Sequence, residues 1–361
     1  MNDRYAVALS GGVDSSTTAA MLLNEGHEVF GVTMLLQSTG CQMVIDKASK
    51  VAQQLGIKHY VFDAINEFKK EVIDYFINSY MTGTTPNPCA ICNKKIKLNK
   101  LLSFAQEKGA DYLATGHYAN IECINNDVFL KESKNSLKDQ SYFLSLTSRE
   151  HLKYIKTPLC NITHKQETRN LAKSFGLNNF HEKDSQDICF IRNGDYISFI
   201  RDNIEDKKLL NKCGNIILQS NGNCIAQHKG LVNYTIGQRR GLGIPNNEPL
   251  YVTNINYSNN TLTVGIKRDL LVKTFQVNQF NWLLDINDNK FECHVRIRAG
   301  HSKYKSLVEI ISNDVVNVHL LENNTVAVCP GQVCALYNKD NVVIGAGIIT
   351  LQECNNSYTT T

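Results

Sequence analysis

The chain has 361 residues and a formal net charge of +4, from 38 lysines and arginines against 34 aspartates and glutamates. This length predicts two or three domains with ample core, and so mild a positive charge permits a nucleic-acid partner without requiring one. The first residues, MNDRYAVALS, contain no long apolar segment, and no run of about 18 apolar residues occurs elsewhere, so we expect neither a signal peptide nor a membrane span. Twelve cysteines in such a chain favour reduced thiols and a cytoplasmic location.

Strand-like and helical runs alternate up to about residue 200. Strand-like runs at residues 5–10, 27–37 and 58–64 are each followed by a helical run, at 15–24, 46–56 and 66–81. A further helical run at 95–109 precedes a strand-like run at 111–119. Strands separated by helices predict a parallel, doubly wound sheet of the α/β class. Near Thr163 the letters THKQ predict a further helix that begins with a capping box.

The second part of the chain has a different pattern. From about residue 209 the helical period fades, and short apolar runs such as NIILQS, LYVTNINY, TLTVGI and TVAVCP are separated by Asn, Asp and Gly turns. Short strands separated by such turns predict one or two small β domains.

The junction between the first strand and the first helix has an unusual composition. Residues 9–17 read LSGGVDSST, with two glycines, an acid and three serines. A turn between a parallel strand and a helix lies at the carboxyl edge of the sheet, where ligands bind. Gly11 and Gly12 can take positive φ and bring backbone N–H groups toward an anion, and the helix N-terminus adds partial positive charge. The junction therefore suits phosphate, although it is not a Walker loop.

A simpler interpretation of this junction is a tight turn in which Asp14 or Ser15 caps the helix. The full stretch SGGVDS after a first strand resembles, however, the pyrophosphate loop of the ATP pyrophosphatase superfamily. That resemblance implies an enzyme that splits ATP between the α- and β-phosphates and adenylates an oxygen of its substrate. Enzymes that catalyse several different reactions share this loop, so the reaction must be predicted from the other motifs.

The second motif, TTPNPCAICNKKIKLNK at residues 84–100, contains two cysteines before a lysine-rich helix. Pro86 and Pro88 fix an extended lead-in, so Cys92 should fall at the start of the helix. A helix N-terminus and nearby cations lower the pKa of a thiol, which makes Cys92, or Cys89, a candidate nucleophile. Two alternatives stay open: half of a zinc site, for which no second Cys-x-x-Cys or His-x-His pair occurs, and two buried cysteines.

A third motif, EKDSQDICFIRNGDY, contains Cys189, which taken alone would be interpreted as a buried strand cysteine. The motifs SGGVDSS, GVTM, TPNPC..CN..IK, ATGHYA, KDQSYFL, DSQDICFI, TIGQRRGLGI and GQVCALY occur in this order across nearly the whole chain. Together they resemble the tRNA-specific 2-thiouridylase family. The resemblance implies an α/β ATP pyrophosphatase domain at residues 1–205, a small central β-rich domain at 206–268 and a C-terminal β-barrel domain at 269–361.

The resemblance also implies site residues and a reaction. ATP, with Mg²⁺, would be held by Ala8, Leu9, Ser10, Gly11, Gly12, Val13, Asp14, Ser15, Met34 and Gly116. Cys189 would receive sulfur as a persulfide, and Cys92 would be the partner nucleophile that forms a disulfide with Cys189 or releases the sulfur. The wobble uridine of a tRNA would attack the α-phosphate through its 2-oxygen, and sulfur would then displace AMP at carbon 2. A sulfur-relay or cysteine-desulfurase-linked protein would donate the persulfide.

Two features depart from the family. Many members carry Asp, the expected acid or base, where this chain has Cys89. The proton transfer would then pass to a thiol with a tuned pKa, to water or to a neighbouring group. The loop at residues 37–44 is also shorter than is usual in the family.

Positive charge is concentrated in local clusters, which can bind phosphate without a high overall pI. Solvated surface faces are the ordinary alternative for any single cluster. The family resemblance implies that the target base flips out of the anticodon stack and that tRNA contacts His117, Lys138, Asp139, Gln140, Arg298 and Gln332. His117 has a second interpretation, as a loop histidine that bonds the backbone near the ATP site.

Two other functions fit parts of the sequence. One is an ATP-dependent amide or C–N ligase of the same superfamily, which would use ammonia or an amino acid and would not need Cys92 and Cys189. The other is a non-catalytic tRNA-binding protein with a vestigial loop, which the intact Asp14 and Ser15 argue against.

Overall fold

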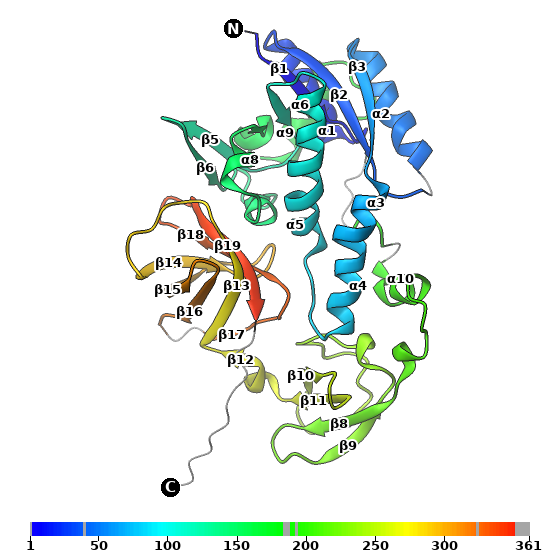
Figure 1. The fold of residues 1–361 in the computed structure, drawn as a ribbon, viewed down its shortest axis with the longest axis vertical. Coiled ribbons are helices and arrows are strands. Elements are labelled where there is room, and N and C mark those ends of the chain that lie inside the picture. The colour runs from blue at the N-terminus through cyan, green and yellow to red at the C-terminus, as the bar shows by residue number, and fades with distance from the viewer. Residues whose placement is uncertain (1, 39–40, 183–187, 192–193, 323–324, 351–361) are drawn as a thin grey trace.

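The computed structural model describes residues 2–38, 41–182, 188–191, 194–322 and 325–350. Within these ranges the chain forms three successive parts: an α/β part, a small four-stranded sheet and a closed β-barrel (Figure 1). Across the same ranges, no helix combines the length and the apolar character that crossing a bilayer requires.

The first part is built on five parallel strands in the order β3-β2-β1-β4-β7. The strands are β1 (Arg4–Ala8), β2 (Glu28–Leu35), β3 (Lys58–Asp63), β4 (Tyr112–Ala114) and β7 (Ile155–Lys156). The chain runs from β1 outward to β3 and then returns to the other side of β1. The strand order therefore reverses between β1 and β4, and ligands bind at the carboxyl edge next to such a reversal.

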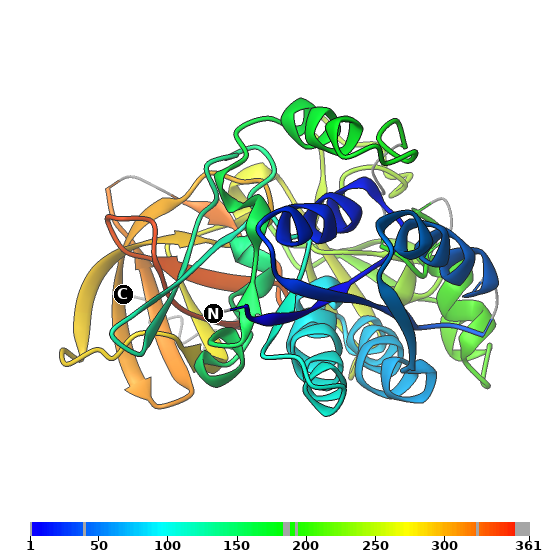
Figure 2. The same cartoon turned by 90° about the horizontal axis from the view of Figure 1, so that it is seen from above.

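Helices cover both faces of this sheet, which confirms the predicted doubly wound class (Figure 2). Two helices lie on one face, α1 (Val13–Asn24) and α2 (Cys41–Leu55). The helices that connect β3 to β4 lie on the other face, as right-handed crossovers on the two sides of β1 require. They form two long helical segments: α3 (Ile65–Phe68), a π-helix (Lys69–Ile73) and α4 (Asp74–Met81), then α5 (Pro88–Cys92), a second π-helix (Asn93–Lys100) and α6 (Leu101–Glu107).

The rest of the α/β part is a hairpin followed by short helices. These elements are β5 (Asn120–Ile124), β6 (Asp127–Lys131), α7 (Ser141–Leu144), α8 (Arg149–Leu152), α9 (Lys165–Ser174) and α10 (Tyr196–Asn203). The predicted capping box before α9 is wrong, because His164 occupies the N-cap position without a side-chain bond. The hydroxyl of Thr163 donates to the carboxylate of Glu167 instead of accepting from the helix backbone.

The central sheet and the barrel confirm the predicted β-rich second half. The central sheet contains β8 (Gly214–Leu218), β9 (Cys224–His228), β10 (Tyr251–Asn256) and β11 (Thr261–Gly265). The barrel closes in the order β13 (Thr274–Trp282), β16 (Val315–Leu320), β15 (Tyr304–Ser312), β14 (Lys290–Arg296), β18 (Val333–Tyr337) and β19 (Val343–Thr350). A short pair, β12 (Leu271–Val272) and β17 (Val326–Ala327), lies outside it. The domain limits at residues 206 and 269 stay predictions.

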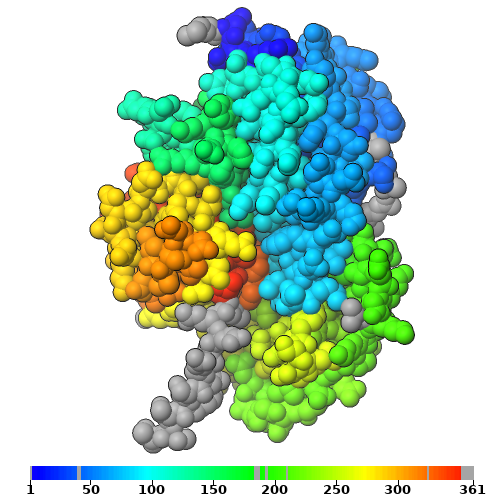
Figure 3. Space-filling view, viewed as in Figure 1, coloured from blue at the N-terminus to red at the C-terminus, as the bar shows by residue number. Residues whose placement is uncertain are grey.

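The barrel packs directly against the α/β part (Figure 3). One hydrophobic cluster contains Tyr142 and Leu144 of α7 together with Val333, Tyr337 and Ala346 of the last two barrel strands. The Tyr142 hydroxyl also donates to the carbonyl oxygen of Val333 at 2.9 Å. Because the two parts share a core, the barrel is held in a fixed position beside the carboxyl edge of the sheet.

Candidate active site

A cavity of about 780 Å³ opens at the carboxyl edge of the sheet, at the ends of β1, β2 and β4. Its lining includes every residue predicted for ATP except Gly11: Ala8, Leu9, Ser10, Gly12, Val13, Asp14, Ser15, Met34 and Gly116. The lining also includes the predicted sulfur carrier and three residues predicted to contact tRNA: Cys189, His117, Lys138 and Gln140. The fold thus brings residues predicted for three different roles to one cavity.

The loop after β1 depends on its two glycines in different ways. Gly11 has φ +77°, and a Cβ there would lie 2.6 Å from the Cβ of Lys47, so this position requires glycine. Gly12 is extended, with φ −77° and ψ 158°, so only one of the two glycines uses the predicted positive φ. Gly12 is the N-cap of α1 and no side chain caps that helix, which contradicts Asp14 or Ser15 as the cap. No side chain therefore covers the N-terminus of α1. Phosphate binding requires such an open helix N-terminus.

Asp14 is the acidic group of this loop, and two side chains hold it. The Nζ of Lys165 lies 2.7 Å from both carboxylate oxygens, and the Tyr118 hydroxyl donates to Oδ1 at 2.8 Å. The Asp14 side chain is still 32% exposed, so part of it remains open to a cation in the cavity. Gly116 lies behind the loop, where a Cβ would come within 2.8 Å of the backbone nitrogen of Ser15. Only glycine at this position lets the loop after β4 support the loop after β1.

The cavity lining combines cationic and apolar side chains. Its lysines are Lys47, Lys97, Lys138 and Lys165, against the two acids Asp14 and Glu182. Lys47 and Glu182 form an ion pair at 3.0 Å. The end of β2 and the first turn of α2 contribute the apolar side chains Val32, Met34, Leu36, Met43 and Val44. This combination fits a nucleotide, because phosphates attract cations and a base packs on apolar surface.

The two predicted catalytic cysteines come together from distant parts of the sequence. Cys92, which is 5% exposed, shares a hydrophobic cluster with Phe190, and Ile188 packs against the same cluster. These two residues flank Cys189, which is exposed and lines the cavity. The predicted partners Cys92 and Cys189 are both free thiols, as is Cys89. The segment 183–187 of the Cys189 motif lies outside the described residues.

The expectation that Cys92 is poised as a thiolate is wrong for this structure. Cys92 is the fifth residue of the helical segment that begins at Pro88, and burial raises its pKa to about 12 despite the opposing charge of Lys97. Burial also raises the pKa values of Cys89 and Cys189, again against the charge of Lys97. Cys189 is exposed as a residue, yet the protein surrounding its sulfur still disfavours the charged form. Desolvation therefore outweighs the helix and lysine effects on which the prediction rested.

The alternatives for the Cys-x-x-Cys motif can also be compared with the structure. Among the described residues, no group of three or more His, Cys, Asp or Glu side chains could hold a metal ion. The interpretation as two buried cysteines fits Cys92, whereas Cys89 is only partly buried. The side chain of Asn87 caps α5 by accepting from the backbone N–H of Ala90 at 3.1 Å, so the motif has a defined conformation.

His117 faces the cavity as a neutral ring. Its Nδ1 lies 2.9 Å from the Thr115 hydroxyl, so its partner is a side chain and not the backbone. Burial, reinforced by the charge of Lys97, lowers the pKa of His117 to about 3. A neutral imidazole can stack on a base or share hydrogen bonds with it, but it supplies no charge for a phosphate.

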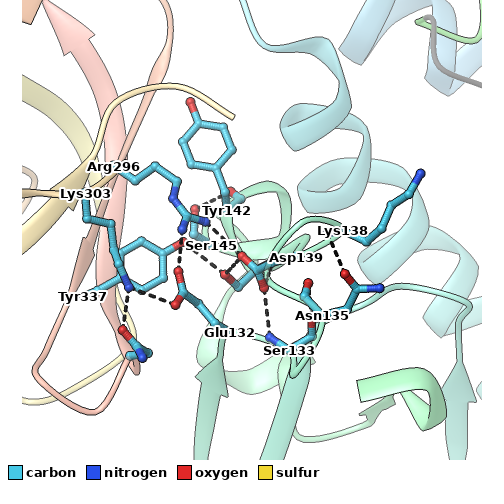
Figure 4. A network of polar contacts seen from close by, with 12 residues as sticks. Glu132, Ser133, Asn135, Lys138, Asp139, Tyr142, Ser145, Arg296, Lys303 and Tyr337 are labelled. Carbon is cyan, nitrogen blue, oxygen red and sulfur yellow. Dashed lines mark hydrogen bonds and ion pairs between the residues drawn. The ribbon is translucent and has the colours of Figure 1, made fainter. Parts of the chain in front are cut away.

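The carboxylate of Asp139 is bound within the protein, and Asp139 does not belong to the cavity lining that includes its neighbours Lys138 and Gln140. Its side chain is 2% exposed, and Oδ2 accepts from Arg296 Nη1 at 2.9 Å and from the Ser141 hydroxyl at 2.8 Å (Figure 4). The contact of Asp139 with tRNA stays a prediction, and its carboxylate is enclosed by Arg296 and Ser141. Its position suits it to fix the conformation of the two neighbours that line the cavity.

Gln332 also bonds within the protein. Its Nε2 donates to the carbonyl oxygens of Thr85 at 2.9 Å and Pro86 at 3.1 Å, and so ties a barrel turn to the segment leading into α5. Arg298 is exposed after β14 and lies near the same turn, where its charge opposes the burial that raises the pKa of Cys329. Contacts of Gln332 and Arg298 with tRNA stay predictions.

The cavity residues that sequence reasoning missed include Lys47, Tyr118 and Lys165. Tyr118 belongs to the motif ATGHYA, directly after two predicted site residues, and that adjacency was the available signal. Lys165 is separated from Asp14 by 151 positions, so only the tertiary structure reveals their ion pair.

Comparison with known proteins covers nearly the whole chain. Sequence models described as tRNA methyl transferase HUP domain, tRNA methyl transferase PRC-barrel domain and aminomethyltransferase beta-barrel domain match residues 3–193, 199–266 and 272–349. The tRNA-specific 2-thiouridylase MnmA of Rickettsia typhi is 44% identical over 356 residues, which cover 95% of this chain and 98% of that protein. Proteins of the same name from Rickettsia conorii and Rickettsia prowazekii are also 44% identical over 95% of this chain, and over 94% and 98% of their own lengths.

Solved structures show only partial likeness. The NMN synthetase of Francisella tularensis is 15% identical with a TM-score of 0.34, over 50% of this chain and 66% of that chain. The NH3-dependent NAD synthetase of Campylobacter jejuni is 18% identical with a TM-score of 0.33, over 49% of this chain and 66% of that chain. Likeness at this level adds nothing to the assignment of fold or function.

Proposed function

The chain belongs to the tRNA-specific 2-thiouridylase family, and we propose that it replaces the 2-oxygen of the wobble uridine of tRNA with sulfur in an ATP-dependent reaction. The observation that supports this most directly is the single cavity lined by both the loop after β1 and Cys189. Adenylation creates a leaving group at carbon 2, and sulfur must reach that same carbon. Both steps therefore require one site, and a shared cavity provides it.

We assign ATP to the nucleotide side of the cavity. The backbone of the loop after β1 and the ammonium groups of Lys47 and Lys165 would bind the phosphates, and Met34 would pack against the adenine. Asp14 would face Mg²⁺ once Lys165 moves from its carboxylate to the phosphate oxygens. ATP supplies the adenylyl group that activates the uridine oxygen, and pyrophosphate leaves.

We assign the sulfur to Cys189. The terminal sulfur of a Cys189 persulfide attacks carbon 2, the carbon–oxygen bond breaks, and AMP leaves with the electron pair. A Cys92 thiolate then attacks the Sγ of Cys189, which releases 2-thiouridine and leaves a Cys92–Cys189 disulfide that an external thiol must reduce. In the alternative order, Cys92 attacks first and releases hydrosulfide, which then attacks carbon 2.

The raised pKa of Cys92 has a consequence for both orders. Its thiol must lose a proton before it attacks, and the nearby cation Lys97 favours the thiolate.

Cys89 lies one helical turn earlier on the same face of α5, where the family's acid or base would stand. Because burial raises the pKa of Cys89, it is a poor proton relay, and we expect Cys89→Ser to keep most activity. A loss of about 10²–10⁴-fold, partly restored by Cys89→Asp, would instead assign acid–base catalysis to this position.

The partners follow from the same reaction. Lys138 and Arg298 would bind tRNA phosphates, and neutral His117 would contact the flipped base inside the cavity. A persulfide-carrying protein would load Cys189, which is exposed enough to be reached. We place the reaction in the cytoplasm, where free thiols persist.

The decisive experiment is mass spectrometry of nucleosides from unmodified tRNA incubated with the protein, Mg²⁺–ATP and either sulfide or a persulfide donor. We expect 2-thiouridine, AMP and pyrophosphate in the presence of a persulfide donor. Cys189→Ser should abolish the product, because a serine hydroxyl cannot carry transferable sulfur, while Cys213→Ser serves as the matched exposed-thiol control.

Two outcomes would contradict this proposal. Formation of ADP and orthophosphate would exclude pyrophosphatase chemistry. Turnover driven by ammonia or an amino acid, unchanged in a Cys92/Cys189 double variant, would favour an amide or C–N ligase of the same superfamily.

A further inference from the structure

Two hydrogen bonds join the segment predicted to meet tRNA to Tyr118, which lies in the loop after β4. The backbone N–H of Gln140 donates to the backbone carbonyl oxygen of Tyr118 at 2.7 Å. In return, the backbone N–H of Tyr118 donates to the side-chain Oε1 of Gln140 at 2.9 Å. Both residues line the cavity, so a displacement of the segment around Gln140 moves Tyr118 directly.

The other end of Tyr118 holds the acid of the ATP loop. The Tyr118 hydroxyl lies 2.8 Å from Asp14 Oδ1 and 2.7 Å from the hydroxyl of Thr168. A carboxylate can only accept, so Tyr118 donates its one proton to Asp14 and accepts from Thr168. The ring is 3% exposed, and the Nζ of Lys165 lies 5.7 Å from its centroid. Tyr118 therefore fixes Asp14 and contacts the lysine that neutralises it.

The segment that carries Lys138 and Gln140 is itself held by the barrel. Between those two residues, Asp139 accepts from Arg296 of β14 at 2.9 Å and from the backbone N–H of Ser133 at 3.0 Å (Figure 4). In the same segment, the backbone N–H of Lys138 donates to the side-chain Oδ1 of Asn135 at 3.2 Å. The segment is thus a defined structure with one end in the barrel interface and the other on Tyr118.

We propose that Tyr118 is a positioning residue that couples binding of tRNA at residues 138–140 to binding of Mg²⁺–ATP at Asp14. This inference rests on the proposed function, because it assigns tRNA to one end of the contact and ATP to the other. Phosphate contacts on Lys138 restrict the segment, and the restriction passes through Gln140 and Tyr118 to Asp14. Mg²⁺–ATP then binds a carboxylate that is already ordered, so it binds more tightly, and ATP strengthens tRNA binding by the same factor.

The test compares the affinity of Mg²⁺ and α,β-methylene-ATP with and without saturating unmodified tRNA, by isothermal titration calorimetry. In the natural protein we expect tRNA to tighten binding of the analogue by about tenfold. Tyr118→Phe removes only the hydroxyl, and the ratio of the two affinities should fall to near one. Thr168→Val removes the donor to that hydroxyl and should reduce the ratio in the same direction. Tyr154→Phe, at a tyrosine that is 45% exposed, is the matched control and should keep the natural ratio.

A merely structural role predicts a different result. In that case Tyr118→Phe would weaken binding of the analogue equally with and without tRNA, and the unchanged ratio would overturn the proposal. A ratio of one in the natural protein would overturn it as well. Failure of the proposed function is separate, because it would appear as absence of 2-thiouridine from the natural protein in the nucleoside assay.

Discussion

Arg296 is the centre of the polar contact between the α/β part and the barrel, and replacing it by methionine tests that contact. Its guanidinium bonds Asp139 at 2.9 Å and Glu132 at 2.5 Å, and the three side chains are 13%, 2% and 16% exposed. The guanidinium carbon also lies 5.2 Å from the centroid of the Tyr337 ring. Methionine is long and can cover the same ring, so Arg296→Met removes mainly the charge and the hydrogen bonds.

The expected loss follows from what remains buried. Removing one member of a buried ion pair costs about 3–5 kcal/mol, because the other charge loses its partner. Lys303 still pairs with Glu132 at 2.8 Å, so the loss falls on Asp139, and we expect the lower end, about 3 kcal/mol in free energy of unfolding.

The loss should depend on pH in a defined direction. Burial already raises the pKa of Asp139 above its ordinary value, and removal of Arg296 raises it further. When the pKa of a carboxyl is higher in the folded than in the unfolded protein, protonation of that carboxyl stabilises the folded state. This stabilisation is lost as pH rises through the pKa of the folded state. The deficit of Arg296→Met should therefore be largest at neutral pH and shrink as pH falls toward about 4, the ordinary pKa of an aspartate.

Urea unfolding at two pH values measures this deficit. Fluorescence of Trp282, the one tryptophan of the chain, reports on β13 of the barrel, and far-ultraviolet circular dichroism reports on the helices of the α/β part. Arg268→Met is the matched control, because that side chain is 82% exposed and should change stability little. A deficit below about 1 kcal/mol at neutral pH, or one that does not shrink on acidification, would refute the reasoning from a buried, unpaired Asp139.

Three further predictions concern the site. Gly11→Ala should lower stability by about 1–2 kcal/mol and abolish titratable binding of an ATP analogue, whereas Gly26→Ala, at φ +87° with open space around it, should lower stability but leave that binding intact. Iodoacetamide at mildly alkaline pH should label Cys189 well before Cys92, because Cys92 is 5% exposed and burial raises its pKa to about 12. Peptide mass spectrometry measures the two labelling rates, and equal rates would contradict the burial of Cys92. Lys138→Ala should make the slope of log K for tRNA against log salt shallower by roughly 0.7–0.9, and an unchanged slope would remove Lys138 from the interface.

The parts of the fold that the sequence predicted are those with a local signal. Alternating strands and helices specify the doubly wound sheet, and the letters around Gly11 specify a loop at its carboxyl edge. The cavity at that edge follows from the topology, since parallel strands end together. The role of Cys189 was predicted only from the resemblance to a family, because its own motif taken alone predicts a buried strand.

The parts that could not be predicted depend on contacts between distant positions. Asp139 meets Arg296 across 157 positions, and Gln332 meets Pro86 across 246. No local pattern shows that these polar groups are already satisfied within the protein. Cys92 illustrates a second reason, because its pKa is decided by burial, which neighbouring lysines in the sequence do not reveal.

The shared core between α7 and the barrel has a consequence for synthesis of the chain. Tyr142 and Leu144 leave the ribosome early, but their partners in β18 and β19 are among the last described residues. Until those strands emerge, a nascent chain that already contains the complete parallel sheet exposes an apolar face beside its catalytic edge. Domains usually fold in order as they are made, and incomplete ones expose surfaces that chaperones bind. Because this face is covered only once β18 and β19 have been made, we expect chaperones to retain a chain that stalls within residues 206–330.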